Sequence, residues 1–278
     1  MDILAAVILG IVQGIGEFLP ISSSGHLVIA GELLDRGLGL GRSGDQKLLL
    51  NVTLHAGTLA SILVIYRKEI WELRSQPRVC GLLVLASIPA AVVGFTMKES
   101  LELIFATPLV VGVALFGTAA LLLLGQKLEK SELNYAHLPL KHAFLIGLLQ
   151  AGALIPGISR SGSTIAGGLM LGLQRKSAAT FSFLMAIPVM AGAVLLEMQD
   201  VLSGQTVIDS PAALVAGGVV AFAVGLLCLT WMMGLIARGR LHWFAYYCIA
   251  VGTATIVWQL FATVFAVPVV LESWQSPG

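Results

Sequence analysis

The chain has 278 residues, of which 57% are hydrophobic and only 11% are charged, and its net charge is +1. A typical soluble domain is about 25% charged, so this composition excludes a soluble protein and predicts a polytopic membrane protein. The near-zero net charge also argues against a nucleic-acid partner, which would call for a strong basic excess.

Apolar runs of two lengths follow one another along the chain. A run of roughly 20 apolar residues is enough to cross a bilayer core of about 30 Å. Six runs are long enough to span: residues 48–66, 81–97, 107–125, 180–197, 211–233 and 242–265. Four runs are too short: residues 3–18, 22–34, 142–154 and 163–173. The sequence therefore predicts an all-α protein with six transmembrane helices and two pairs of shorter helices.

Each short pair is joined by a polar break that contains glycine and proline, either Phe18–Gly25 or Ile155–Gly162. Irregular backbone at membrane depth is tolerated only where protein or a water-filled cavity satisfies its polar groups. We therefore expect two re-entrant helical hairpins whose breaks line a site.

The two halves of the chain resemble each other around these breaks. Gln13 precedes Gly25 by twelve residues, and Gln150 precedes Gly162 by twelve. Each half consists of one hairpin and three spans, and an odd number of spans turns the second half upside down. The pattern predicts an inverted-topology repeat, 1–125 and 126–278, within a single membrane domain, with the two hairpins meeting near the midplane.

The loops divide by charge, and an excess of lysine and arginine marks the cytoplasmic side of a membrane protein. Basic residues lie at the ends of alternate spans, at Arg67, Lys68, Arg74, Arg78, Lys127, Lys130, Lys141, Arg175, Lys176, Arg238 and Arg240. Residues 198–210 and the tail after Ala266 contain none. Six spans threaded through these loops predict that both termini lie outside. The 35–47 loop is an exception, because it is expected outside yet carries Arg36, Arg42 and Lys47.

The first break concentrates polar chemistry in an apolar setting. A carboxylate, three hydroxyls and an imidazole fall within ten residues, at Glu17, Ser22, Ser23, Ser24 and His26. An ionisable group inside a membrane costs about 2.5–3.5 kcal/mol on insertion scales and marks a functional site. A purely structural alternative has Glu17 in an ion pair and one serine capping the next helix. That alternative does not explain why Glu17 and His26 flank the same break.

The second break places Arg160 between Ser159 and Ser161, just before Gly162. A helix start offers free N–H groups and the positive end of a dipole. Arginine adds a planar fork of donors that matches phosphate oxygens, and glycine lets the backbone approach closely. This pattern predicts a phosphate site, with an inert Arg160–Glu17 ion pair as the alternative.

These two motifs, Glu17–His26 and Pro156–Thr164, resemble the signature motifs of the bacterial undecaprenyl-diphosphate phosphatases, the bacitracin-resistance family. The resemblance extends to Leu54–Leu59 and Phe181–Pro188. It implies hydrolysis of undecaprenyl diphosphate to undecaprenyl phosphate and inorganic phosphate, which recycles the lipid carrier of cell-wall synthesis. It also implies a tendency to form homodimers and dependence on a divalent cation, Mg²⁺ or Ca²⁺. A location in the bacterial plasma (inner) membrane, with the active site opening to the outer face, is expected on the same ground.

Position by position, the resemblance implies catalytic roles for Glu17, Ser23, His26 and Arg160. It implies substrate-binding roles for Gln13, Ser22, Ser24, Ser159, Ser161 and Gly162. The family has glutamate or glutamine four residues before its catalytic glutamate, and this chain has Gln13 there. A metal site of two carboxylates is therefore in doubt, although Glu17 and the Gln13 carbonyl oxygen are both ligands that Mg²⁺ and Ca²⁺ accept. His55 also matches the family, and packing is the favoured interpretation of its role.

Cleavage of a diphosphate requires a positively charged group beside the transferred phosphoryl group, where it stabilises the negative charge of the oxygens. We assign this role to Arg160. Ser23, activated by Glu17 or His26, is the preferred nucleophile, because an adjacent base is the usual device for activating a hydroxyl. Direct attack by His26, or by a water that Glu17 activates, remains open. The rival hypotheses are a lipid-phosphate transporter or flippase that uses the same midplane anion site, and a non-catalytic lipid-binding scaffold.

Overall fold

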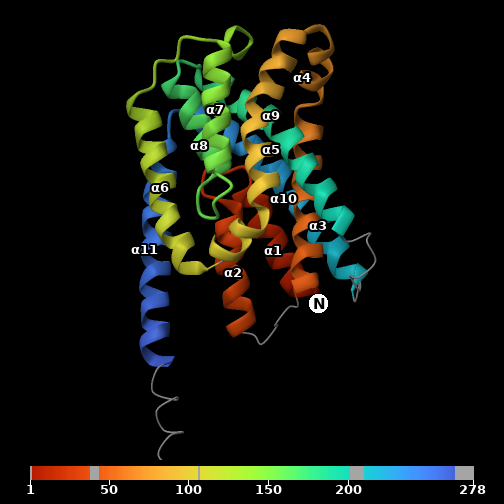
Figure 1. The fold of residues 1–278 in the computed structure, drawn as a ribbon, viewed down its shortest axis with the longest axis vertical. Helices are drawn as coiled ribbons and strands as arrows, with labels where there is room; N and C mark the ends of the chain where they lie inside the picture. Colours follow the sequence, from red (N-terminus) through yellow and green to blue (C-terminus); the bar gives the residue numbers. More distant parts are fainter. Residues whose placement is uncertain (1, 38–43, 106, 201–209, 267–278) are drawn as a thin grey trace, which may run out of the picture.

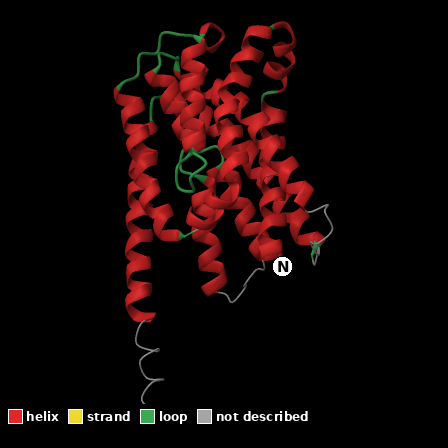
Figure 2. Cartoon of the chain, viewed as in Figure 1, coloured by secondary structure: helices red, strands yellow, loops and turns green. Residues whose placement is uncertain are grey.

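The computed structural model describes residues 2–37, 44–105, 107–200 and 210–266, which form helices joined by turns, with no β-strand among them (Figures 1 and 2). In chain order the α-helices are α1 Ile3–Gly16, α2 Ser23–Gly37, α3 Gly44–Ile65, α4 Arg67–Glu72, α5 Pro77–Phe105, α6 Pro108–Lys127, α7 Leu140–Gly152, α8 Arg160–Met170, α9 Arg175–Asp200, α10 Pro211–Ala237 and α11 Leu241–Ala266. Two 3-10 turns, Leu73–Ser75 and Tyr135–His137, complete the described helical elements.

Six of these helices are long and apolar enough to cross a membrane. Their spanning segments are Gln46–Ile65, Pro77–Met97, Pro108–Lys127, Arg175–Leu196, Pro211–Ala237 and Leu241–Ala262. They correspond one to one with the six runs predicted from the sequence, with ends that differ by at most five residues, so the prediction of a multi-pass all-α protein is confirmed. Large apolar side chains such as Phe95 and Leu227 are about 70% exposed on the outer surface, as a surface in contact with lipid requires.

The four short helices form the two pairs that the sequence predicts. The first arm of each pair has 14 residues in α1 and 13 in α7, which at 1.5 Å per residue spans only about 20 Å. In Figure 1, α1 begins and α2 ends toward the lower end of the bundle, whereas α7 begins and α8 ends toward the upper end. The connecting turns lie between these ends, side by side. Re-entry of the two pairs from opposite faces of a bilayer stays a prediction.

Small residues let the hairpins pack closely against long helices. A Cβ atom added to Gly10 of α1 would lie 2.6 Å from the Gly217 carbonyl oxygen of α10. A Cβ atom added to Gly147 of α7 would lie 2.4 Å from the Ala86 carbonyl oxygen of α5. Close backbone approach through small residues is a common way to hold membrane helices together. Each hairpin is thus fixed against a helix from the other half of the chain.

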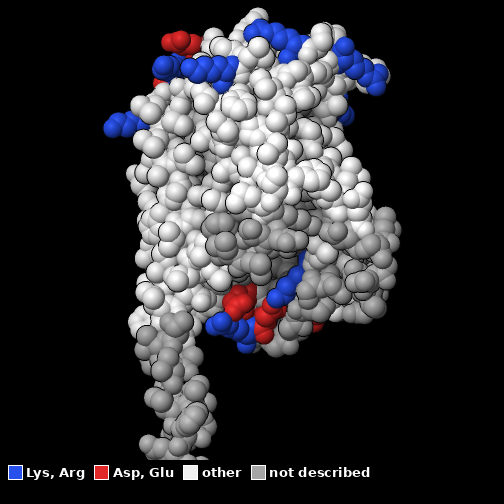
Figure 3. Space-filling model, viewed as in Figure 1, with Lys and Arg blue, Asp and Glu red and all other residues white. Residues whose placement is uncertain are grey.

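Charged side chains separate along the bundle. Figure 3 shows mainly Lys and Arg, with one small acidic group, along the upper end, few charged side chains in the belt below it, and a smaller mixed group of acids and bases at the lower end. The start of α1 and the end of α11 both lie toward the lower end (Figure 1). The protein therefore has the charge asymmetry along its axis that the loop counts predict.

Two of the three basic residues in the exceptional 35–47 segment form ion pairs in the structure. Arg36 pairs with Glu32 at 2.5 Å within α2, and Lys47 of α3 pairs with Asp35 of α2 at 3.2 Å. The second pair ties α2 to α3, a role that is independent of membrane orientation. Arg42 lies outside the described residues.

Candidate active site

The first break is a tight turn between α1 and α2, held by one serine. Ser22 has a φ of +72°, a left-handed conformation that costs of order 1–3 kcal/mol in a non-glycine residue. Its hydroxyl accepts hydrogen bonds from the N–H groups of Gly25 (3.3 Å) and of Gly157 (3.1 Å). The first bond caps the start of α2, and the second joins this turn to the other hairpin. Ser22 therefore fixes the two breaks against each other.

The second break is held by α6. The Thr118 hydroxyl donates to the Gly157 carbonyl and accepts from the Ser159 N–H, each at 2.8 Å. Gly157 has a φ of +100°, which glycine adopts without strain. The Ser159 hydroxyl accepts from the Gly162 N–H at 3.0 Å and so caps α8. The polar backbone of this break is thus satisfied by protein groups, as expected for irregular chain at membrane depth.

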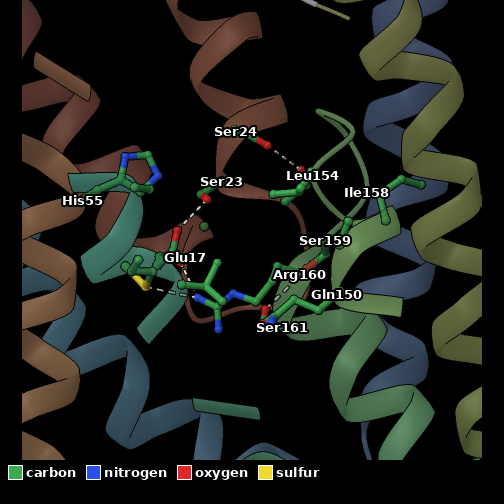
Figure 4. A pocket seen from close by; sticks show the side chains of 16 residues that line it. Glu17, Ser23, Ser24, His55, Gln150, Leu154, Ile158, Ser159, Arg160 and Ser161 are labelled. Carbon is green, nitrogen blue, oxygen red and sulfur yellow. Dashed lines mark hydrogen bonds and ion pairs between the residues drawn. The ribbon is translucent and has the colours of Figure 1, made fainter. Parts of the chain in front are cut away.

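The two hairpins meet through the carboxylate of Glu17. One oxygen of Glu17 forms an ion pair with Nη2 of Arg160, a residue 143 positions away in the chain (Figure 4). The other oxygen accepts from the Ser23 hydroxyl at 2.7 Å and from the Gln13 amide at 3.1 Å. The side chains of Glu17 and Arg160 are 7% and 16% exposed. Removing one partner of such a buried pair would leave an uncompensated charge, so the pair holds both hairpins in position.

A cavity of about 180 Å³ opens beside this ion pair. Its polar lining comes from both breaks, with His55 added from α3, and part of its wall is apolar. The lining residues are Gly16, Glu17, Ser22, Ser23, Ser24, His55, Gln150, Ala153, Leu154, Ile158, Ser159, Arg160, Ser161, Val189, Met190 and Ala193. Such a lining suits a polar head group that is attached to an apolar tail.

Most of the residues predicted from the sequence line this cavity: Glu17, Ser22, Ser23, Ser24, Ser159, Arg160 and Ser161. Gln13 and Gly162 do not line it. Gln13 lies fully buried behind Glu17, and its amide also donates to the Thr58 hydroxyl at 3.4 Å. Gly162 packs against Ser159 and Pro20. These two residues support the lining from behind.

His26 is not among the cavity-lining residues. Its two ring nitrogens lie 2.8 Å from the Ser22 carbonyl oxygen and 2.9 Å from the Tyr247 hydroxyl. Its ring stacks on that of Tyr247, with centroids 5.6 Å apart and planes at 13°. This geometry holds the Ser22 turn against α11, and a direct catalytic role for His26 stays a prediction.

Two polar residues that were not assigned to the site from the sequence also line the cavity. The first is His55, whose Nδ1 lies 2.9 Å from the Asn51 carbonyl oxygen of its own helix. That contact leaves Nε2 as the nitrogen available to a ligand. The second is Gln150, the counterpart of Gln13 in the predicted internal repeat. The motif around His55 and the repeated glutamine were the signals in the sequence.

The cation implied by the resemblance can be tested against the residues present. The part of the chain that the structure describes holds no group of three or more His, Cys, Asp or Glu placed to bind a metal. Glu17 already faces Arg160, and the buried Oε1 of Gln13 has no hydrogen-bond partner in the described structure. Mg²⁺ is often held by one or two carboxylates together with substrate phosphates. The residues fit a cation only if the substrate brings most of its ligands.

Comparison with known proteins identifies the family of this chain. Residues 6–254 match the model of the family described as bacitracin resistance protein BacA. An undecaprenyl-diphosphatase of Rhodopirellula baltica is 47% identical over 264 residues, which cover 93% of this chain and 99% of the relative. Undecaprenyl-diphosphatases of Christiangramia forsetii and Methanosphaera stadtmanae are 39% and 38% identical, each match covering 92% of this chain and 98% of the relative. The chain therefore belongs to the bacitracin resistance protein BacA family.

Proposed function

We propose that this protein hydrolyses undecaprenyl diphosphate to undecaprenyl phosphate and inorganic phosphate in the bacterial inner membrane, and so recycles the carrier lipid of cell-wall synthesis. The observation that carries the proposal is the Glu17 carboxylate, which joins the Ser23 hydroxyl to the Arg160 guanidinium beside a cavity among apolar helices. A transporter needs only binding groups, whereas this arrangement contains a hydroxyl already bonded to a base. The names of the relatives support the same activity.

The geometry supports a two-step reaction. Ser23 Oγ attacks the terminal phosphorus and its proton passes to Glu17, whose oxygen lies 2.7 Å away. The Ser23–phosphorus bond forms as the bond from phosphorus to the lipid phosphate breaks, and the lipid phosphate departs. Water then cleaves the phosphoserine and releases inorganic phosphate. Arg160 stabilises the charge on the transferred phosphoryl oxygens. Attack by a Glu17-activated water is the competing mechanism.

The divalent cation remains part of the proposal. Oxygens of the diphosphate would provide most of its ligands, with the Glu17 carboxylate and the unpartnered Gln13 Oε1 as protein ligands. Bound there, it would supply positive charge against the phosphates. The homodimer implied by the family resemblance likewise stays a prediction.

The proposal is tested by assaying the purified protein with undecaprenyl diphosphate in detergent. We expect inorganic phosphate to be released together with the lipid monophosphate, and Glu17→Gln to be nearly inactive because the base is lost. Binding of the lipid without any release of phosphate would contradict the enzyme and favour a carrier.

We assign to His55 the transfer of a proton to the leaving group in the first step and from the attacking water in the second, because its imidazole lines the cavity. We expect His55→Gln to lower kcat about a hundredfold, within the usual range for a general acid–base group. His26→Gln is the matched control and should cost less than about tenfold, since His26 contacts Ser22 and Tyr247. Steady-state kinetics of both folded variants provide the test. The opposite ranking would return the catalytic role to His26.

The inverted repeat of 1–125 and 126–278 is supported by the way the halves exchange contacts. α1 of the first half packs on α10 of the second, and α7 of the second half packs on α5 of the first. In the predicted repeat α1 corresponds to α7, and α5 corresponds to α10. The two packings are therefore the same contact related by the proposed pseudo-symmetry.

Orientation yields a separate prediction. Both termini, and residue 205, which lies outside the described residues, should face outward, while Arg74 and Arg238 should face the cytoplasm. Single cysteines at Gln205, Arg74 and Arg238, in a chain lacking Cys80, Cys228 and Cys248, can be exposed to an impermeant thiol reagent in intact cells. We expect labelling only at position 205. Labelling at Arg74 without labelling at position 205 would invert the assigned orientation.

A further inference from the structure

We propose that Gln150 binds the lipid-linked phosphate of the substrate, the phosphate that remains on the isoprenoid after cleavage; this inference rests on the proposed function. Gln150 is only 1% exposed, yet neither its amide nitrogen nor its amide oxygen has a hydrogen-bond partner within the described structure. The same residue lines the cavity. An unpaired buried polar group is destabilising, so a side chain with two such atoms calls for a ligand.

Gln13, the counterpart of Gln150 in the predicted internal repeat, has protein partners for its amide nitrogen, although its Oε1 has none within the described structure. Gln13 donates its amide hydrogens to Glu17 and Thr58 and lies behind the cavity lining. Gln150 occupies the corresponding place in the second hairpin and reaches the cavity itself. The amide nitrogen at this position therefore hydrogen-bonds to protein groups in the first hairpin, whereas in the second hairpin it is left open to a ligand.

A second unused donor lies on the same hairpin. Nη2 of Arg160 is occupied by Glu17 and lies 3.5 Å from the Met190 sulfur, whereas Nη1 is buried with no hydrogen-bond partner among the described residues. Figure 4 shows Gln150 beside Ser161, on the side of the cavity away from His55. The Gln150 amide and the Arg160 guanidinium thus offer donors to a diphosphate, whose non-bridging oxygens can accept them.

The apolar lining decides which of the two phosphates lies near Gln150. The second hairpin contributes apolar Ala153, Leu154 and Ile158 to the cavity beside its polar residues, whereas the first hairpin contributes glycine, the Glu17 carboxylate and three serine hydroxyls but no large apolar side chain. An isoprenoid chain leaves the cavity on its apolar side because burying it there removes apolar surface from water. The terminal phosphate then faces Ser23, and the lipid-linked phosphate lies on the side of Gln150.

The test measures binding without turnover, in a Ser23→Ala background, with three probes: farnesyl diphosphate, farnesyl monophosphate and inorganic phosphate. Gln150→Leu keeps the volume and removes the hydrogen bonds. We expect it to weaken both farnesyl ligands about ten- to a hundredfold, the range for a hydrogen bond to a charged group, and to leave inorganic phosphate unchanged. Gln150→Asn, which keeps the amide on a shorter stem, should show an intermediate loss and serves if the leucine variant does not fold. Gln174→Leu, at an exposed turn away from the cavity, is the matched control.

Unchanged affinity for farnesyl monophosphate in the Gln150 variants would overturn the inference, since the amide would then be satisfied by water. An equal loss for inorganic phosphate would also overturn it, by placing Gln150 on the transferred phosphate. The proposed function is tested separately, by phosphate release from the unaltered protein. Absence of that release would reject the proposed function, whereas the affinities measured here test only the role of Gln150.

Discussion

Replacing Arg160 with alanine should reduce turnover by about three orders of magnitude or more, because an arginine that stabilises a transferring phosphoryl group is worth about 10³–10⁵ in rate. Arg160 is placed for this role by the start of α8 and by its ion pair with Glu17. Nη2 of its guanidinium is already bound to Glu17, and Nη1 is left without a protein partner in the described structure. Phosphate release from the prenyl diphosphate, at saturating substrate, is the measurement.

Arg160→Lys tests whether activity needs the planar shape of the guanidinium or only its positive charge. Lysine keeps a positive charge beside Glu17, so the buried carboxylate is not left uncompensated as it is in the alanine variant. A lysine ammonium does not reproduce the planar fork that presents one nitrogen to Glu17 and another to the phosphate. We therefore expect severe impairment in a protein that still elutes as a folded species in detergent. Near-normal activity of the lysine variant would remove Arg160 from any role that depends on its fork.

Replacing Ser23 with alanine should lower kcat by several orders of magnitude if Ser23 attacks phosphorus. The nucleophile and its base act as a unit, so adding Glu17→Gln to Ser23→Ala should cost little more than either change alone. Ser24→Ala is the matched control, because Ser24 also lines the cavity but its hydroxyl lies 3.4 Å from that of Ser22, while the serine bonded to Glu17 is Ser23. Rapid acid quench during turnover should trap a phosphoserine in the unaltered protein.

The competing mechanisms give different results in the same experiment. If a Glu17-activated water attacks, Ser23 contributes only a hydrogen bond to the phosphate, and its loss costs about ten- to two-hundredfold in rate. A loss of that size with no trapped phosphoenzyme would reject covalent catalysis at Ser23. An acid-labile, base-stable phosphoenzyme would instead move the nucleophile to a histidine.

The sequence was sufficient for the features that depend on local chain properties. The length and hydropathy of each run predicted the six spanning helices, because a helix must match the thickness of the hydrocarbon core whatever its neighbours are. The predicted breaks at Phe18–Gly25 and Ile155–Gly162 each begin after the first short helix of a pair and run into the first turn of the second, since glycine, proline and capping serines set helix ends by local geometry. The pairing of Glu17 with Arg160 was one of two alternatives considered, and the structure contains it together with the Ser23 contact.

Tertiary structure decided which polar side chains face the cavity. His26 and His55 both lie in apolar segments beside polar motifs, and their sequence context favoured His26. The structure turns His26 toward Tyr247 of α11 and places His55 at the cavity. That choice depends on how α2 and α3 are rotated and packed against helices far away in the chain. Gln13 and Gln150 differ for the same reason: their motifs match, but only the packing around each leaves one amide bonded to Glu17 and the other open to the cavity.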